Sequence, residues 1–247
     1  MKKDYAVALD NFFPETGVVR VRGGSRVYSA LSGPVLALAP HALSLFGLYS
    51  NPDGTTHLVR VQAGNAVELE TGLTGTRWTS EEYRNHTLFF SVDGSSDPVR
   101  VTPSGAVETD AGFERDEDSP DAYSFNPRDI ARGLGFKSRF WLAEREDPLL
   151  WYTSTPGGVT GPVVPFDLGL ASPGFRKVAG LGALTLDGGD GVDDYFVILD
   201  VAGTLLLYQG LDPALTNQWF KRGTYKVGRP LGDNPLVNFG GDLLAIT

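Results

Sequence analysis

The tripeptide Val-Arg-Val occurs three times in this chain of 247 residues, at a constant spacing of 40. The copies lie at residues 19–21, 59–61 and 99–101. The second and third copies share further residues at equal distances: Asp53-Gly54 with Asp93-Gly94, Ala66-Val67-Glu68 with Ala106-Val107-Glu108, and Gly72 with Gly112. A fixed period of this length indicates one supersecondary unit that is repeated along the chain.

The residues around each tripeptide predict what the repeated unit contains. Apolar residues alternate with a polar one in Val-Arg-Val, which is typical of a half-buried strand. A turn with glycine and a second strand follow each copy, at residues 26–30, 65–69 and 105–109. Strands at 43–49 and 87–92 precede the second and third copies through turns that contain Asp-Gly, a strong hairpin signal.

The later part of the chain repeats this pattern with longer loops. It predicts two further meanders, with strands at 139–143, 149–153 and 161–166, and then at 194–199, 204–208 and 220–227. The strand equivalent to Val-Arg-Val is then present five times, near Val19, Val59, Val99, Leu150 and Leu206. The first unit lacks two preceding strands, and the end of the chain supplies two, at 236–239 and 243–247.

We therefore expect an all-β fold, a five-bladed β-propeller closed by N- and C-terminal strands that share one blade. Residues 1–247 would form a single domain, with blades at 34–72, 78–112, 130–170, 176–227, and 236–247 plus 5–30. In this arrangement residues 19–22 pair with residues 243–247. The alternative is an open β-sandwich in which the 40-residue echo is coincidental.

Three segments do not fit the strand pattern. Residues 80–85 and 127–134 are the only ones with brief helical character. The acidic stretch 114–121 is expected to form an exposed loop between two units.

Composition excludes several classes of function. The chain has no cysteine, which excludes disulfides, thiolate metal sites and cysteine nucleophiles. Its formal net charge of −9 argues against a basic surface for nucleic acid, but is compatible with lining a conduit past which DNA moves. No run of 18 apolar residues is present, so we expect no membrane span.

The segment from Asp187 to Asp194 is the most suggestive candidate for a metal site. Its sequence is Asp-Gly-Gly-Asp-Gly-Val-Asp-Asp, and closely spaced carboxylates on such a turn can supply the oxygens that calcium binds. Gly188 and Leu186 stand where further oxygen ligands would be needed. A solvated turn rich in Asp and Gly is therefore favoured over a cation site, and we predict no metal, cofactor or catalytic residue.

The remaining candidates are also interpreted as structural. A glycan-active hydrolase would need converging carboxylates, and nothing in the sequence brings Glu81, Glu82, Glu144 and Glu146 together. The repeat arginines are expected to pair with a carboxylate on the neighbouring strand, such as Glu68 or Glu108, rather than to form a ring of charge; they are Arg20, Arg60 and Arg100. The tryptophans are expected in the core between units, and the histidines in core or surface roles: Trp78, Trp141, Trp151, Trp219, His41, His57 and His86.

Six segments, in their order and spacing, resemble a family of structural proteins from tailed bacteriophages. They are residues 6–14 (Ala-Val-Ala-Leu-Asp-Asn-Phe-Phe-Pro), 19–24 (Val-Arg-Val-Arg-Gly-Gly), 193–197 (Asp-Asp-Tyr-Phe-Val), 208–213 (Tyr-Gln-Gly-Leu-Asp-Pro), 228–232 (Gly-Arg-Pro-Leu-Gly) and 240–247 (Gly-Gly-Asp-Leu-Leu-Ala-Ile-Thr). No single segment is diagnostic, and the resemblance depends on the ordered set, which spans nearly the whole chain.

This resemblance implies a virion protein of a phage tail or head–tail junction, similar to the hub or nozzle of short tails. Such proteins form oligomeric rings, hexameric for example, around the DNA channel, contact other tail, portal or adaptor proteins, and are not enzymes. The protein would be made in the bacterial host cytoplasm, and DNA would pass it without sequence-specific binding. Family members usually have a Gly-rich N-terminal lead and continue past Gly-Gly-Asp-Leu-Leu, so the resemblance implies either a compact version or only the propeller portion of a larger assembly. The alternative function is a ligand-binding propeller module for a glycan or a protein.

Overall fold

The structure is a computed structural model, and it divides the chain into two compact units, Met1–Ala30 and Leu31–Thr247. It describes residues 12–15, 18–21, 29–41, 44–62, 64–120, 122–187, 192–215, 217–239 and 242–247. In the first unit, β1 (Phe12–Glu15) and β2 (Val18–Val21) form an antiparallel hairpin.

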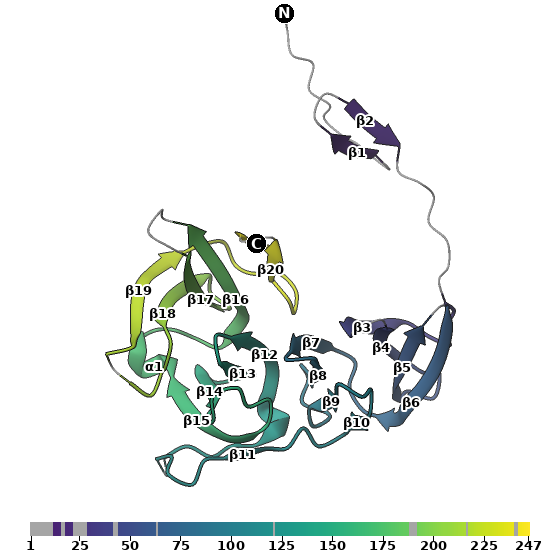
Figure 1. Ribbon diagram of the computed structural model, residues 1–247, viewed down its shortest axis with the longest axis horizontal. Helices are drawn as coiled ribbons and strands as arrows, with labels where there is room; N and C mark the ends of the chain where they lie inside the picture. The colour runs from purple at the N-terminus through teal and green to yellow at the C-terminus, as the bar shows by residue number, and fades with distance from the viewer. Residues whose placement is uncertain are drawn as a thin grey trace, which may run out of the picture. The chain divides into compact units, whose positions relative to one another are not determined.

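The second unit contains four antiparallel meanders (Figure 1). The strands of the first two sheets are β3 (Val35–His41), β4 (Ser44–Ser50), β5 (Thr56–Gln62) and β6 (Asn65–Leu73), then β7 (Trp78–Tyr83), β8 (His86–Ser91), β9 (Val99–Val101) and β10 (Val107–Glu108). Those of the third and fourth are β12 (Ile130–Phe136), β13 (Arg139–Glu144), β14 (Leu149–Thr153) and β15 (Gly161–Asp167), then β16 (Val178–Asp187), β17 (Val192–Asp200), β18 (Thr204–Gly210) and β19 (Trp219–Lys226). A last hairpin consists of β20 (Leu236–Phe239) and β21 (Asp242–Ala245).

The described residues contain only two short helical segments, a 3₁₀ turn η1 (Pro127–Asp129) and α1 (Leu168–Ala171). The expected all-β class is therefore confirmed. The positions that were matched to the tripeptide are confirmed as equivalent in the second unit, because Val59, Val99, Leu150 and Leu206 each lie in the third strand of their sheet. The remaining member, Val19, lies in β2 of the first unit.

Two expectations about local structure are wrong. Residues 80–85 are not helical: they comprise the end of β7 and a tight turn to β8, in which Arg84 and Asn85 both have positive φ. In the segment 127–134 only Pro127–Asp129 is helical, and Ile130 begins β12. Both segments open a sheet, and their pairing with the second strand overrides their weak local preference.

The expectation of a loop at 114–121 is corrected only at its start, because residues 116–120 form turns outside the strands as expected. Phe113–Arg115 forms β11, which joins the third sheet as a fifth strand, parallel to β15. Phe113 is buried in the core between the second and third sheets. Because burial of Phe113 is favourable, the start of the acidic stretch joins the sheet. The charge pattern of the sequence does not predict this strand.

The first strands of successive sheets lie next to one another, in the order β3, β7, β12, β16 and β20. Three buried clusters fill the spaces between successive sheets, and a fourth lies between the fourth sheet and the last hairpin. Each predicted core tryptophan lies in one of them: Trp78 between sheets one and two, Trp151 between two and three, and Trp141 with Trp219 between three and four. The indoles of Trp141 and Trp219 stack at 5.2 Å.

Glycines allow the first strands to approach their neighbours. A Cβ on Gly133 would lie 2.7 Å from Phe140 Cζ, and one on Gly182 would lie 2.8 Å from Leu243 Cδ1. A side chain at either position would therefore displace a packed neighbour. Glycine at these positions also removes the apolar–polar alternation by which a strand is recognised in sequence.

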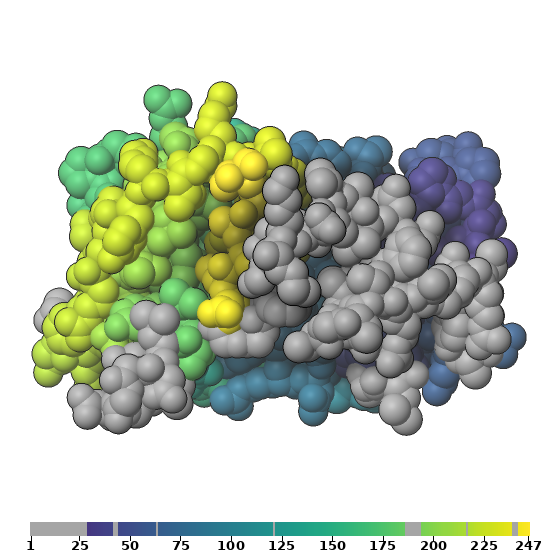
Figure 2. All heavy atoms as spheres, turned by 90° about the horizontal axis from the view of Figure 1, so that it is seen from above, coloured from purple at the N-terminus to yellow at the C-terminus, as the bar shows by residue number. Residues whose placement is uncertain are grey.

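The C-terminal residues, yellow in Figure 2, lie against the green strands of the fourth sheet, as the contacts of β16 with β20 and β21 require. Strand β21 is hydrogen-bonded to β20, and β2 is hydrogen-bonded to β1. The closure that pairs residues 19–22 with 243–247 therefore stays a prediction.

Candidate functional site

A cavity of about 420 Å³ lies where the first strands of the second, third and fourth sheets begin. Its walls contain four cationic and three carboxylate side chains: Arg77, Arg132, Arg145, Lys177, Asp93, Glu146 and Asp233. The bulge residues Ala131 and Ala179 also line it. The cavity therefore carries one excess positive charge in a chain of strongly negative net charge.

Backbone bulges explain how Arg132 reaches this cavity. Register shifts at Ala131 in β12 and at Ala179 in β16 release both carbonyl groups from the regular ladder. Each carbonyl accepts from a side chain of the preceding sheet, Ala131 from Thr79 Oγ1 at 2.7 Å and Ala179 from Arg132 Nη1. Bulges of this kind re-aim side chains next to functional sites.

Arg132 is the central side chain of the cavity. Its Nη1 also donates to the main-chain oxygen of Asp233 at 3.0 Å, whereas its Nε is buried and has no hydrogen-bond partner among the described residues. Burial lowers the pKa of Arg132 to about 10, a shift that nearby Asp233 opposes and Arg77 reinforces. The guanidinium still carries its charge at neutral pH.

Ion pairs occupy two of the three carboxylates. Asp233 accepts from Arg77 through both oxygens, with Arg77 Nε at 2.8 Å, and this contact lowers the pKa of Asp233. Glu146 lies 3.3 Å from Lys177 Nζ. The pair from Arg77 is bidentate, the geometry in which Arg and carboxylate bind most strongly.

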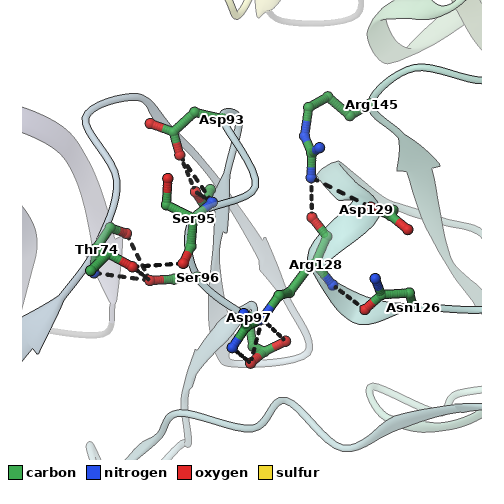
Figure 3. A network of polar contacts seen from close by, with 10 residues as sticks. Thr74, Asp93, Ser95, Ser96, Asp97, Asn126, Arg128, Asp129 and Arg145 are labelled. Atoms are coloured by element: carbon green, nitrogen blue, oxygen red, sulfur yellow. Dashed lines mark hydrogen bonds and ion pairs between the residues drawn. The ribbon is translucent and has the colours of Figure 1, made fainter.

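The third carboxylate, Asp93, belongs to the Asp-Gly turn of the 40-residue repeat (Figure 3). Burial acts to raise the pKa of Asp93, but hydrogen bonds from Ser91, Thr76 and Ser95 hold it below its ordinary value. Gly94 is next to it, and a Cβ there would collide with the guanidinium of Arg145. The repeat turn of the second sheet thus provides the surface on which Arg145 of the third sheet rests.

Arg145 is held at its outer end. Its Nη2 donates to the carbonyl of Arg128 and lies 3.8 Å from Asp129 Oδ1, while its Nε is buried without a partner among the described residues. Arg128 in turn contacts Asp97 at 3.3 Å (Figure 3). Two guanidinium groups with an unused Nε therefore line one cavity.

The predicted carboxylate groups do not converge in the structure. Glu81 lines a second cavity, Glu144 a third, and Glu146 the cavity around Arg132. Burial raises the pKa of Glu81 to about 7, although its hydrogen bond from Gly135 N acts in the opposite direction. Glu82 is exposed on the same strand. The arrangement lacks the facing pair that glycoside hydrolysis uses.

The acidic loop that begins at Asp187 lies largely outside the described residues, and its ability to bind a cation stays open. Asp194 is described: it accepts from Lys137 Nζ and from Thr185 Oγ1, and the contact with Lys137 lowers its pKa. In the part of the chain that the structure describes, no group of three His, Asp or Glu side chains could hold a metal ion.

The repeat arginines behave differently from one another. Arg100 pairs with Glu108 directly across β9 and β10, as predicted. For Arg60 the predicted pairing with Glu68 is wrong, because Val67 is its cross-strand partner and Glu68 lies opposite Val59. Arg20 has no described side chain.

Glu68 instead joins a polar cluster that the sequence did not predict. Its Oε1 accepts from Tyr49 Oη and lies 3.1 Å from His57 Nδ1, while His57 Nε2 lies 2.9 Å from Thr55 Oγ1. The hydrogen bond between Tyr49 and Glu68 raises the pKa of Tyr49 and lowers the pKa of Glu68. Thr55 Oγ1 donates to Asp53 at 2.6 Å, so its proton is not directed at His57 and the cluster stabilises the turn.

The cationic residues of the cavity were not predicted from the sequence. Arg132 stands in the segment Ile-Ala-Arg-Gly-Leu-Gly-Phe, where a lone charge among apolar residues and glycines is the only available signal. Its partners are 47 and 101 residues further along the chain. Contacts of that range are set by the packing of the sheets and leave no local pattern.

Comparison with known proteins gives no family. No protein-family model and no curated protein matches the chain. Among solved structures, the chain is similar to BBS1N, solved in complex with ARL6DN and soaked with lead, with a TM-score of 0.49, 10% identity and coverage of 93% of this chain and 65% of that one. It is also similar to apo AztD from Citrobacter koseri, with a TM-score of 0.31, 12% identity and coverage of 78% and 62%.

The chain spans less than two thirds of either structure, and both TM-scores are too low to carry an inference about fold or function. Within the described residues, no helix has the length and apolar character that crossing a membrane requires.

Proposed function

We propose that the chain forms a five-bladed β-propeller and serves as a structural, non-enzymatic component of a bacteriophage tail or head–tail junction. The four complete meanders supply four blades, and their first strands follow one another as the inner strands of a propeller do. The terminal hairpins β1–β2 and β20–β21 have two strands each, the number needed for one further blade.

The observation that carries the proposal is that apolar side chains are exposed at both ends of the row of sheets. These two ends are called the unfinished ends below. Leu38 on the inner strand β3 is 52% exposed, and so is Leu244 on β21 of the last hairpin, although neighbouring blades of a closed propeller would cover such side chains. Val35 and Ile246 are about half exposed beside them. Apolar side chains at both ends support closure by the terminal hairpins and assembly with further subunits.

The tail assignment is supported by the ordered sequence segments that resemble phage hub and nozzle proteins. A ring of subunits around a DNA channel would also fit an acidic chain, which repels the DNA backbone. We place the protein in the virion, after synthesis in the bacterial host cytoplasm.

Native mass spectrometry of the purified chain tests the proposal. We expect a ring-sized oligomer, such as a hexamer or dodecamer, that Leu244→Glu weakens. Leu170→Glu is the matched control, because Leu170 is exposed on α1, away from both unfinished ends. A stable monomer that binds no other tail protein would contradict the proposal.

A second candidate function, a ligand-binding module, is favoured by the charged cavity around Arg132. Small-molecule sites are concave and contain a few convergent polar groups. A glycan array with the isolated monomer would test for a sugar ligand.

A further inference from the structure

None of the three carboxylates that line the Arg132 cavity is paired with Arg132 or Arg145. Asp233 is bound to Arg77, Glu146 is bound to Lys177, and Asp93 accepts hydrogen bonds from its own turn. Among the described residues, no carboxylate lies within ion-pair distance of Arg132. The cavity thus retains a cation whose hydrogen-bond partners, within the described part of the chain, are the carbonyl oxygens of Ala179 and Asp233.

Leaving a donor buried without a partner is unfavourable, because the group has lost its water and gained nothing in return. Two such donors, Arg132 Nε and Arg145 Nε, belong to residues that line the cavity. Ala143 is the ladder partner of Arg132, and Arg145 follows Ala143 by two residues, which makes the two arginines diagonal neighbours. The two unused donors therefore come from one region of the third sheet.

Both arginines are held in place before any ligand arrives. Arg132 is fixed through Nη1 to the bulge of β16, and Arg145 is fixed through Nη2 to the carbonyl of Arg128 and by its contact with Gly94. Binding would not need to order these long side chains, and preorganisation of this kind raises affinity.

We propose that this cavity binds a phosphate group, either free or as the monoester of a small polar molecule. The guanidinium groups of Arg132 and Arg145, which both line the cavity, would donate to its oxygens, and Lys177 would add charge from the start of the fourth sheet. A tetrahedral phosphate accepts from several directions and carries up to about two negative charges, which suits donors from separate segments better than a planar carboxylate does. The volume of about 420 Å³ leaves room for a small organic group beside the phosphate.

The proposal depends only on side chains of the second unit. It holds whether or not the chain assembles into a tail ring, and an oligomer that fails to bind phosphate would overturn this inference alone. Conversely, a stable monomer that binds phosphate but no other tail protein would contradict the tail proposal alone.

Isothermal titration calorimetry of the whole chain, at constant ionic strength, tests the site with inorganic phosphate, ribose 5-phosphate, ribose and acetate. We expect both phosphates to bind saturably, each with a Kd below about 10 mM. Ribose and acetate should not bind. Tighter binding of ribose 5-phosphate would identify the ligand as an ester, and equal or weaker binding would identify free phosphate. No saturable binding of either phosphate, or equal binding of acetate, would overturn the proposal.

Variants connect the binding to the two arginines. Arg132→Gln is expected to weaken phosphate binding by about tenfold or more, because hydrogen bonds to charged groups are strong. Arg145→Gln serves as the second variant where Arg132→Gln unfolds the chain, which circular dichroism would detect. Arg222→Gln is the control, because Arg222 is exposed and donates to Gln209. This change removes the same charge and should leave phosphate binding unchanged. Unchanged affinity in folded Arg132→Gln or Arg145→Gln would show that the site is elsewhere.

Discussion

Trp151 donates its indole N–H to the carboxylate of Glu144 at 2.7 Å, beside the core between the second and third sheets. Burial raises the pKa of Glu144, and this hydrogen bond opposes the shift because it favours the charged form. One side chain thus supplies both apolar packing and the partner of a buried acid.

Trp151→Phe is expected to lower the free energy of unfolding by about 1–3 kcal/mol at pH 8, because a buried acceptor loses its donor. The loss should be smaller at pH 5, where Glu144 is more readily protonated. Urea denaturation at both pH values measures the difference. Glu144→Gln keeps an acceptor for Trp151 and is the control; equal losses for Trp151→Phe at both pH values would contradict the prediction.

Glu81 should make stability fall as the pH rises. Its pKa is about 7 in the folded chain against an ordinary value of 4.5, so the folded state binds more protons between these values. The effect of Glu81 on the free energy of unfolding is then most favourable below about pH 4.5, and it becomes progressively less favourable up to about pH 7. Glu81→Gln should remove this slope and raise stability at pH 8 by up to about 3 kcal/mol. Thermal denaturation across the range tests this, with the exposed neighbour Glu82→Gln as the control that should change the slope much less.

Gly135 is predicted to be required for the approach of the second and third sheets. A Cβ at this position would collide with the ring of Tyr83, so Gly135→Ala should destabilise the chain by about 1–3 kcal/mol. If that ring is the cause, Gly135→Ala combined with Tyr83→Ala should lose less than the sum of the two single losses. Additive losses in the double-mutant cycle would show that another contact is responsible.

Asp200 should stabilise the turn between β17 and β18 strongly. It is fully buried and accepts from the backbone N–H groups of Arg176, Ala202 and Thr204. Asp200→Ala leaves these donors without a partner and is expected to lower stability by about 3 kcal/mol. Asp53 is in the corresponding turn of the first sheet but is exposed, so Asp53→Ala should show a much smaller loss in the same chemical denaturation experiment.

Closure by the terminal hairpins can be tested with engineered cysteines, because the chain has none of its own. A bismaleimide should cross-link Arg20→Cys to Leu244→Cys if β2 and β21 are neighbours. Arg20→Cys combined with Val67→Cys is the control, since Val67 is equally exposed on β6 of another sheet. Intrachain cross-linking would support closure within one subunit, interchain cross-linking would indicate exchange between subunits, and no cross-link beyond the control would contradict closure.

The sequence predicts the outer strands of this fold better than the inner ones. The strands around Val59, Val99, Leu150 and Leu206 were located because apolar and polar residues alternate in them and hairpin turns bound them. In β12 and β16 glycines such as Gly133 and Gly182 replace the alternating side chains, whereas β3 and β7 contain no glycine and were missed or assigned in part as helix because they lack a clear alternation.

The candidate site was not predictable in the same way. Arg132 becomes significant only when bulges release the carbonyls of Ala131 and Ala179, and when Asp233 arrives from a distant loop. Of the two repeat arginines with described side chains, Arg100 forms the ion pair that was predicted. Its partner Glu108 lies directly opposite on the neighbouring strand, so a rule of local pairing was sufficient.

The parallel strand β11 has a consequence for how copies of this protein can associate. By covering β15, it replaces a seven-residue edge of the third sheet with an edge strand of three residues, and so short an edge is a poor template for a strand from another chain. The other outer strands are guarded differently: β10 has two residues, β6 carries Glu68 and Glu70, and β19 carries Lys221, Arg222 and Lys226. Sheet-to-sheet addition through the outer rim is therefore disfavoured, which leaves the faces and the terminal hairpins of the chain for assembly.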